Sequence, residues 1–138
     1  MKEPSEKRKR TLALHERALR FSNGVNTSCP RTFTTIPARV VWEQLVRAAD
    51  STSNNLIEAD DASSDADFLN KMTIALREVK ESRAALIKVR LGNLDNFELV
   101  KERDLESEAG QLAAIFASII MNMKLRLDEE RRNGLKRK

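Results

Sequence analysis

Apolar residues recur every three or four positions along four long segments of this chain, and that periodicity constrains the fold more than any other feature. Such a spacing places side chains on one face of an α-helix. The expected inner faces are Leu14, Ala18, Phe21 and Val25; Val41, Leu45, Ala48, Thr52 and Leu56; Phe68, Met72, Ala75, Val79, Ser82, Leu86 and Val89; and Leu105, Ala109, Leu112, Phe116, Ile119 and Met123.

Short connectors with helix start and stop signals separate these segments. Ser and Thr side chains cap helix starts, whereas proline and glycine favour helix ends. With only 4 Gly, 3 Pro and no Tyr, the chain lacks the turns and aromatics of an all-β protein. We therefore predict an all-α fold, an antiparallel up-down-up-down four-helix bundle. The boundary signals are Pro30 after the first helix, Thr35 and Pro37 at the second, Ser64 and Asp67 at the third, Gly92 at its end, and Phe97 near the start of the fourth.

The polar stretch at residues 51–55, "STSNN", interrupts the second segment with residues that weaken helix interiors. The apolar phase nevertheless continues through it from Leu45 to Leu56. We therefore expect residues 51–55 to remain helical, with Thr52 on the inner face.

Basic charge is concentrated at the two ends of the chain. Residues 1–10 hold five Lys/Arg and two Glu, and residues 124–138 hold seven Lys/Arg and three acids, within a net charge of +4. We expect a basic N-terminal tail (1–10), a bundle (11–130) and a basic C-terminal tail (131–138). In an up-down-up-down bundle both ends and the acidic connector 58–67 lie together, and this connector can neutralise part of the charge. The candidate phosphate contacts are Lys7, Arg8, Lys9, Arg10, Arg131, Arg132, Lys136, Arg137 and Lys138.

Other chemistry is not predicted. The single histidine, His15, is expected to be exposed, and Cys29 to fill a small apolar gap at a helix end. The acidic connector lacks the ligand alternation and central glycine of a calcium loop. We predict no catalytic residue, metal ligand or cofactor. With no signal-peptide pattern, no membrane-length apolar run and one cysteine, a cytoplasmic setting is expected.

The second and third helices resemble a known bacterial family, the small four-helix-bundle proteins of intervening sequences in large-subunit ribosomal RNA genes. A related branch contains the accessory variability protein of diversity-generating retroelements. The resemblance is carried by "QLVRAADSTSNNLIEA" and "DFLNKMTIALREVKES". The chain departs from the family pattern at Ser53, Ala59 and Arg83, where a proline, a glycine and an acid are typical. The matching residues are Gln44, Arg47, Ala48, Ala49, Ser51, Asn55, Glu58, Phe68, Ile74, Ala75, Leu76 and Glu81.

The matched motif resembles a structural signature rather than a catalytic one. Its polar members, Arg47, Ser51, Asn55, Glu58 and Glu81, suit hydrogen bonding between helices, within the bundle or between subunits. Contact with a ligand or RNA is the alternative interpretation. The resemblance also implies a homopentamer with a basic surface and, in one branch, partnership with a reverse transcriptase.

These observations lead to two hypotheses for function. The first is a non-enzymatic, oligomeric accessory protein that binds RNA or DNA through phosphates. The second is a protein–protein interaction scaffold whose basic tails only aid solubility; an enzyme ranks third, for want of a convergent catalytic set. Apolar residues outside the core seam predict self-association: they are Val40, Ile57, Leu69, Ile87, Ile115 and Ile120.

Overall fold

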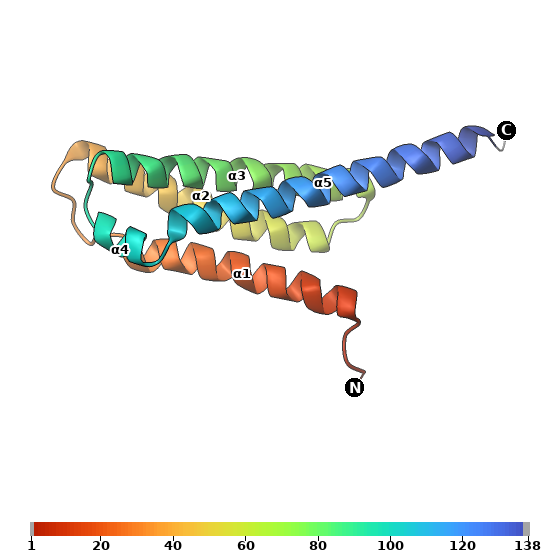
Figure 1. Cartoon of the computed structure of the whole chain (residues 1–138), viewed down its shortest axis with the longest axis horizontal. Coiled ribbons are helices and arrows are strands. Elements are labelled where there is room, and N and C mark those ends of the chain that lie inside the picture. Colours follow the sequence, from red (N-terminus) through yellow and green to blue (C-terminus); the bar gives the residue numbers. More distant parts are fainter. Residues whose placement is uncertain (1, 137–138) are drawn as a thin grey trace.

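The computed structural model describes residues 2–136 and holds five α-helices, with no β-strand in that range (Figure 1). The all-α prediction is therefore confirmed. The four long helices match the four periodic segments, and one short helix was not predicted. The helices are α1 (Glu6–Ser28), α2 (Ile36–Asp60), α3 (Asp65–Leu91), α4 (Phe97–Glu102) and α5 (Leu105–Lys136). Within residues 2–136, none of them is long and apolar enough to cross a membrane.

The first three helices each begin at a hydroxyl side chain that accepts a hydrogen bond from the backbone N–H three residues further on. The predicted caps Thr35 and Ser64 are confirmed, at 3.2 and 3.1 Å. Ser5 caps α1 in the same way, at 3.1 Å. As a result α1 begins at Glu6, and residues 7–10, which the sequence placed in a tail, are helical.

The prediction of a single helix from Phe97 is wrong, because the helix is interrupted at Arg103 and Asp104, which separate α4 from α5. Asp104 has a left-handed backbone (φ 53°), which a continuous helix excludes. The Arg103 guanidinium donates hydrogen bonds to three oxygens near the end of α1, including the hydroxyls of Thr27 and Ser28 at 2.8 and 2.7 Å. These bonds tie the break to α1, a contact that local sequence does not reveal.

One core draws side chains from all four long helices. Most of the predicted inner faces are buried, although their outermost members, such as Leu14 and Met123, are half-buried. Residues 51–55 are helical and Thr52 is fully buried, as expected. The buried indole of Trp42 donates to the backbone oxygen of Asp95 at 2.9 Å, which joins α2 to the connector before α4. The largest fully buried side chains are Trp42, Phe21, Phe116, Leu45, Met72, Leu86 and Leu112.

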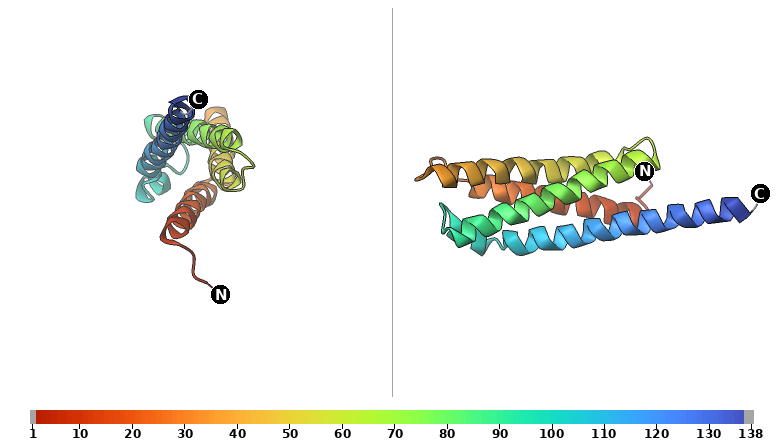
Figure 2. Two further views of the ribbon diagram at one scale, coloured as in Figure 1. Left: turned by 90° about the vertical axis from the view of Figure 1, so that its right-hand side faces the viewer. Right: turned by 90° about the horizontal axis from the view of Figure 1, so that it is seen from above.

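The long helices lie lengthwise beside one another, with α2 and α3 adjacent over most of their length (Figures 1 and 2). The start of α1, the α2–α3 connector and the far end of α5 share one end of the molecule. Two ion pairs agree with this placement. Arg8 of α1 binds Asp60 at 2.6 Å, and Arg126 of α5 lies 3.5 Å from Asp65.

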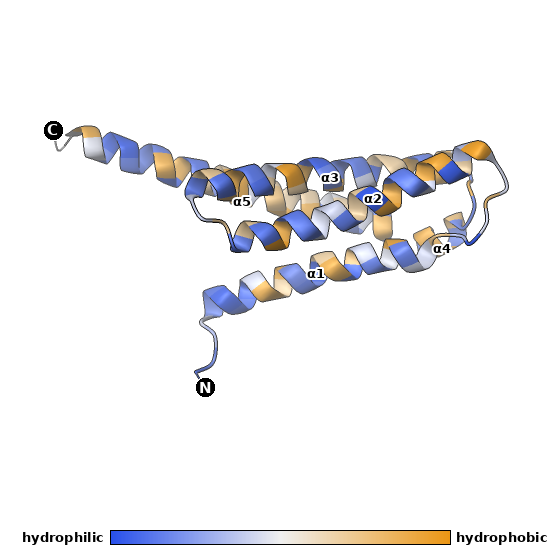
Figure 3. Cartoon of the chain, turned by 180° about the vertical axis from the view of Figure 1, so that it is seen from behind, coloured by the Kyte–Doolittle hydropathy of each residue, from blue (hydrophilic) through white to orange (hydrophobic). Residues whose placement is uncertain are grey.

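The α5 helix continues beyond the α2–α3 connector, so its last turns project from the rest of the molecule (Figure 2). Apolar residues Met121, Leu125 and Leu135 are exposed on the second half of α5, among hydrophilic neighbours (Figure 3). The exposed apolar set differs from the predicted one. Of the six expected residues only Val40 is exposed; Ile120 belongs to the core and the other four are half-buried, because the flanks of each helix also pack against neighbours.

Candidate nucleic-acid interface

The basic start of α1 is partly neutralised by acidic partners. Both carboxylate oxygens of Asp60 accept hydrogen bonds from Arg8, at 2.7 and 2.6 Å. Lys9 lies 3.5 Å from carboxylate oxygens of Glu3 and Glu6. Within the described range, Lys7 and Arg10 are exposed without an ion pair. The four predicted cations of this end are therefore divided, two paired and two available.

The basic end of α5 lies on the projecting part of that helix. Arg131 and Arg132 are exposed there and helical. For Lys136 only the helical backbone is described, and the candidates Arg137 and Lys138 lie outside the described residues. The described cations of the predicted tails therefore lie on two elements, the start of α1 and the projecting end of α5, which share one end of the molecule.

The polar motif in α2 makes fewer bonds between helices than expected. The Asn55 amide donates to the backbone oxygen and hydroxyl of Ser51, at 2.8 and 3.0 Å, so this pair stays within α2. Glu58 does bridge helices, because its carboxylate lies 3.1 Å from the ammonium group of Lys71 in α3.

Arg47 and Glu81 of the same motif are exposed and form no ion pair within residues 2–136. They line a groove of about 300 Å³ between α2 and α3, together with Gln44, Ala84, Ala85 and Lys88. The helix–helix role predicted for the motif therefore applies to Glu58, whereas Arg47 and Glu81 face solvent.

Glu78 is a buried carboxyl that the sequence analysis did not single out. It is 9% exposed, and its Oε2 atom has no hydrogen-bond partner among the described residues. Burial and then the neighbouring Glu81 carboxyl raise the pKa of Glu78, while Arg77 and Arg47 act to lower it. The sequence signal is the Glu-x-x-Glu spacing in α3, which places two carboxyls on adjacent turns.

His15 and Cys29 contribute no reactive cluster. His15 is half-buried rather than exposed, because it lines an apolar recess with Leu14 and Phe68 between the start of α1 and the other helices. Cys29 is partly buried, and burial raises the pKa of its thiol. Across the described residues, no three His, Cys, Asp or Glu side chains are grouped as a metal site requires.

Exposed cations on α3 were largely missed by the sequence analysis. Arg77, Lys80, Arg83 and Lys88 are all exposed, and none of their side chains forms an ion pair or hydrogen bond within residues 2–136. By contrast, Arg90 makes two hydrogen bonds to Glu106, at 2.9 and 3.1 Å, and these bonds raise the pKa of the Arg90 guanidinium and lower that of the Glu106 carboxyl. The sequence does contain a signal for this basic surface, namely five Lys/Arg between residues 77 and 90. The clusters at the two chain ends are denser and therefore drew the prediction.

The fold and these charges define a class: a small all-α protein in which, within residues 2–136, the exposed side chains without an ion pair include more Lys and Arg than Asp and Glu. The chain belongs to the 23S rRNA-intervening sequence protein family, whose model matches residues 10–118. It is also similar in fold to a crystal structure of a protein of unknown function from the S23 ribosomal protein family of Bacteroides thetaiotaomicron. The TM-score is 0.62 at 24% identity, over 80% of this chain and 97% of that one. No curated protein matches the chain.

Proposed function

We propose that this protein is a non-enzymatic, oligomeric accessory protein that binds RNA or DNA through phosphate contacts. It would act in the cytoplasm as an antiparallel up-down-up-down four-helix bundle. The observation that carries the proposal is the surplus of exposed, unpaired Lys and Arg side chains in a member of a family named for ribosomal RNA intervening sequences. Lys and Arg neutralise phosphates and release counterions, which supplies affinity without base recognition.

The chain-end cations are the first candidate contacts. Lys7 and Arg10 are exposed near the start of α1, and Arg131 and Arg132 are exposed near the end of α5. These two helix ends lie at the same end of the molecule but apart from each other (Figure 1). Arg8 contributes less to this surface, because Asp60 already neutralises it through two hydrogen bonds. Oligomerisation, as the family resemblance implies for a pentamer, would multiply the contacts and add avidity.

Salt dependence of binding tests the proposal. We expect the variant carrying Arg10→Gln, Arg131→Gln and Arg132→Gln to weaken binding to unrelated nucleic acids to a similar degree. Its logarithmic salt slope should fall by up to about 2.7 on duplex DNA, at about 0.9 per phosphate contact. Fluorescence anisotropy at several salt concentrations measures both quantities.

A matched control removes the same charge at the opposite end of the molecule. It carries Arg31→Gln, Arg39→Gln and Lys101→Gln, three exposed residues without ion pairs within the described range. An equal loss of affinity in both variants would mean that the net charge of the protein alone is responsible for the binding. Absence of any binding at low salt would contradict the proposed function.

An interaction scaffold is the second candidate function, and a specific observation favours it. Met121 and Leu125 are 63% and 59% exposed on the second half of α5. Exposed apolar residues grouped on one element mark protein contacts. A partner protein would cover them; for one family branch the resemblance implies a reverse transcriptase.

A further inference from the structure

The outer side of α3 carries a row of uncompensated positive charge. Its members, which we call the α3 row, are Arg77, Lys80, Arg83 and Lys88. From Arg77 to Lys88 they extend eleven residue steps, or about 16.5 Å along the helix axis at 1.5 Å per residue. Around the axis they spread from the groove beside α5, which Arg83 lines, to the groove beside α2, which Lys88 lines. Because α3 packs against its neighbours along its length, this spacing is held rigid in the folded protein.

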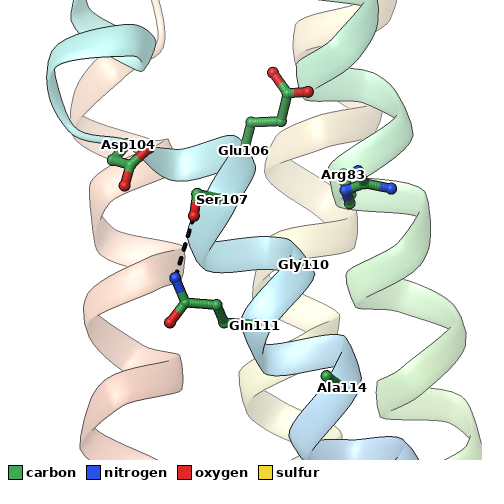
Figure 4. Close-up of a pocket in the computed structure, with 7 residues that line it drawn as sticks. All are labelled: Arg83, Asp104, Glu106, Ser107, Gly110, Gln111 and Ala114. Carbon is green, nitrogen blue, oxygen red and sulfur yellow. Dashed lines mark hydrogen bonds between the residues drawn. The ribbon is translucent and has the colours of Figure 1, made fainter.

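Acids lie near this row, but none of them forms an ion pair with it within residues 2–136; the buried Glu78 carboxyl lies near Arg77. The exposed Glu81 lies on the α2 side, in the groove that contains Arg47 and Lys88. On the α5 side Glu106 lies near Arg83 but is bound by Arg90. Asp104 lines the opposite side of the groove that Arg83 borders (Figure 4). The row therefore remains positive, in contrast to the start of α1, where acidic partners take two of four cations.

Arg83 borders an open groove between α3 and α5 that leaves it accessible (Figure 4). The groove has a volume of about 530 Å³, and Gly110 and Ala114 of α5 line it. A Cβ atom at Gly110 would lie 3.5 Å from the Arg83 Nε atom, so the Arg83 side chain lies close to α5 at this glycine. Ser107 and Gln111 hydrogen-bond to each other at 3.1 Å on the far side of the groove.

Aromatic side chains are not available on the surface to stack on bases. Trp42, Phe21 and Phe116 are buried, and the remaining described phenylalanines are half-buried. Proteins that hold single strands use exposed aromatic rings as stacking platforms. A rigid row of cations without such rings suits recognition of a duplex by its backbone instead.

We propose that the α3 row binds the phosphate backbone of base-paired nucleic acid, such as an RNA stem or a DNA duplex. This inference rests on the proposed function and deepens it. The chain ends would supply affinity for any strand, whereas the cations of the α3 row, held at fixed positions on a packed helix, would supply preference for a double helix. RNA and DNA present the same phosphate chemistry, so the experiment includes both.

The test uses the full chain and three fluorescent probes: an RNA hairpin, a DNA duplex of the same stem sequence, and a single-stranded oligouridine. The α3 variant carries Lys80→Gln, Arg83→Gln and Lys88→Gln. We expect the wild-type protein to bind at least one duplex at least about tenfold more tightly than oligouridine, and the α3 variant to lose this preference. Its salt slope on duplex DNA should fall by about 2 to 3, as expected for loss of three phosphate contacts.

The chain-end variant is the matched control, because it loses the same number of charges. It should weaken binding to stems and to oligouridine to the same degree, with the stem preference retained. A charge-preserving variant, with Lys80→Arg, Arg83→Lys and Lys88→Arg, should bind like the wild type. Since all three side chains are exposed and unbonded within residues 2–136, circular dichroism should be unchanged in the Gln variant.

Each contrary outcome has a distinct meaning. A stem preference that survives in the α3 variant would overturn the assignment to α3 and leave the proposed function intact. Equal wild-type affinity for stems and oligouridine would overturn the base-paired class of ligand. Equally tight binding of polyglutamate would identify a general polyanion site. Failure to bind any nucleic acid would remove the proposed function together with this inference.

Discussion

At the residue scale, Glu78 is the buried ionisable group that the fold leaves without a full set of partners. Its carboxyl lies in α3 beside Glu81, with Arg47 and Arg77 as the nearest opposing charges. Burial disfavours the charged form, so the pKa of Glu78 is raised above its ordinary value of 4.5. The folded protein therefore holds this proton more tightly than the unfolded chain does.

Stability should consequently depend on pH through this group. The contribution of Glu78 is fully present below pH 4.5 and is lost as the pH rises through the higher pKa of the folded state. Glu78→Gln removes the charge and keeps the shape, so we expect it to raise the free energy of unfolding at neutral pH by about 1 kcal/mol. The gain should vanish in acid. Urea denaturation at several pH values measures it.

Glu43→Gln is the control, since Glu43 is exposed on α2 and does not act on the Glu78 carboxyl. Its effect on stability should stay within about 0.5 kcal/mol, the range of ordinary surface substitutions. A Glu78→Gln variant that is less stable than the wild type at every pH would contradict the interpretation. It would mean that the charged carboxylate is bonded in the folded protein.

At the scale of elements, the connection from α3 to α5 depends on residues with left-handed backbones. Asn93, Asn96 and Asp104 have positive φ angles, and side chains of this type tolerate that region best. Asn96 also donates from its side-chain amide to the backbone oxygen of Ser28, at 2.9 Å. This bond joins the start of α4 to the end of α1.

A pair of substitutions at Asn96 separates the two contributions. Asn96→Gly keeps the left-handed backbone accessible but loses the bond to Ser28, at a cost of about 1 kcal/mol. Asn96→Ala also strains the backbone and should cost roughly 1 kcal/mol more. Chemical denaturation gives both values. Equal stability of the two variants would mean that the backbone at this position relaxes.

Gly110 in α5 offers a stabilising substitution at the same scale. An added Cβ atom would meet Arg83 at an ordinary contact distance of 3.5 Å, and alanine is the better helix former. We expect Gly110→Ala to raise the free energy of unfolding by up to about 1 kcal/mol. Gly24→Ala in α1 is the matched control, because its Cβ atom would crowd Leu105 at 3.1 Å and should gain less. A larger gain at Gly24 would contradict the packing described here.

At the scale of the whole molecule, the exposed apolar residues on the second half of α5 predict self-association. Light scattering at micromolar concentration should give a multiple of the 15.7 kDa chain mass, and five copies if the family resemblance holds. Met121→Gln with Leu125→Gln should shift this assembly toward monomer. The control pair, Ile36→Gln with Leu91→Gln, removes exposed apolar residues at the opposite end and should leave the mass unchanged. A wild-type monomer would refute the assembly.

The sequence by itself determined the long helices, most of their inner faces and the caps at Thr35 and Ser64. Helical periodicity and capping involve residues only three or four positions apart, so local sequence contains the information. It also determined that residues 51–55 stay helical, because the apolar phase around Thr52 was unbroken.

Only the tertiary structure decided which charges are free. Arg8 is neutralised by Asp60, which is 52 positions away along the chain. Arg103, at the break between α4 and α5, donates a hydrogen bond to Ser28, which is 75 positions away. Burial of Glu78 and exposure of the α3 row likewise depend on which helices pack beside α3. Ion pairs and solvent access are set by neighbours in space, and spacing along the chain does not encode them.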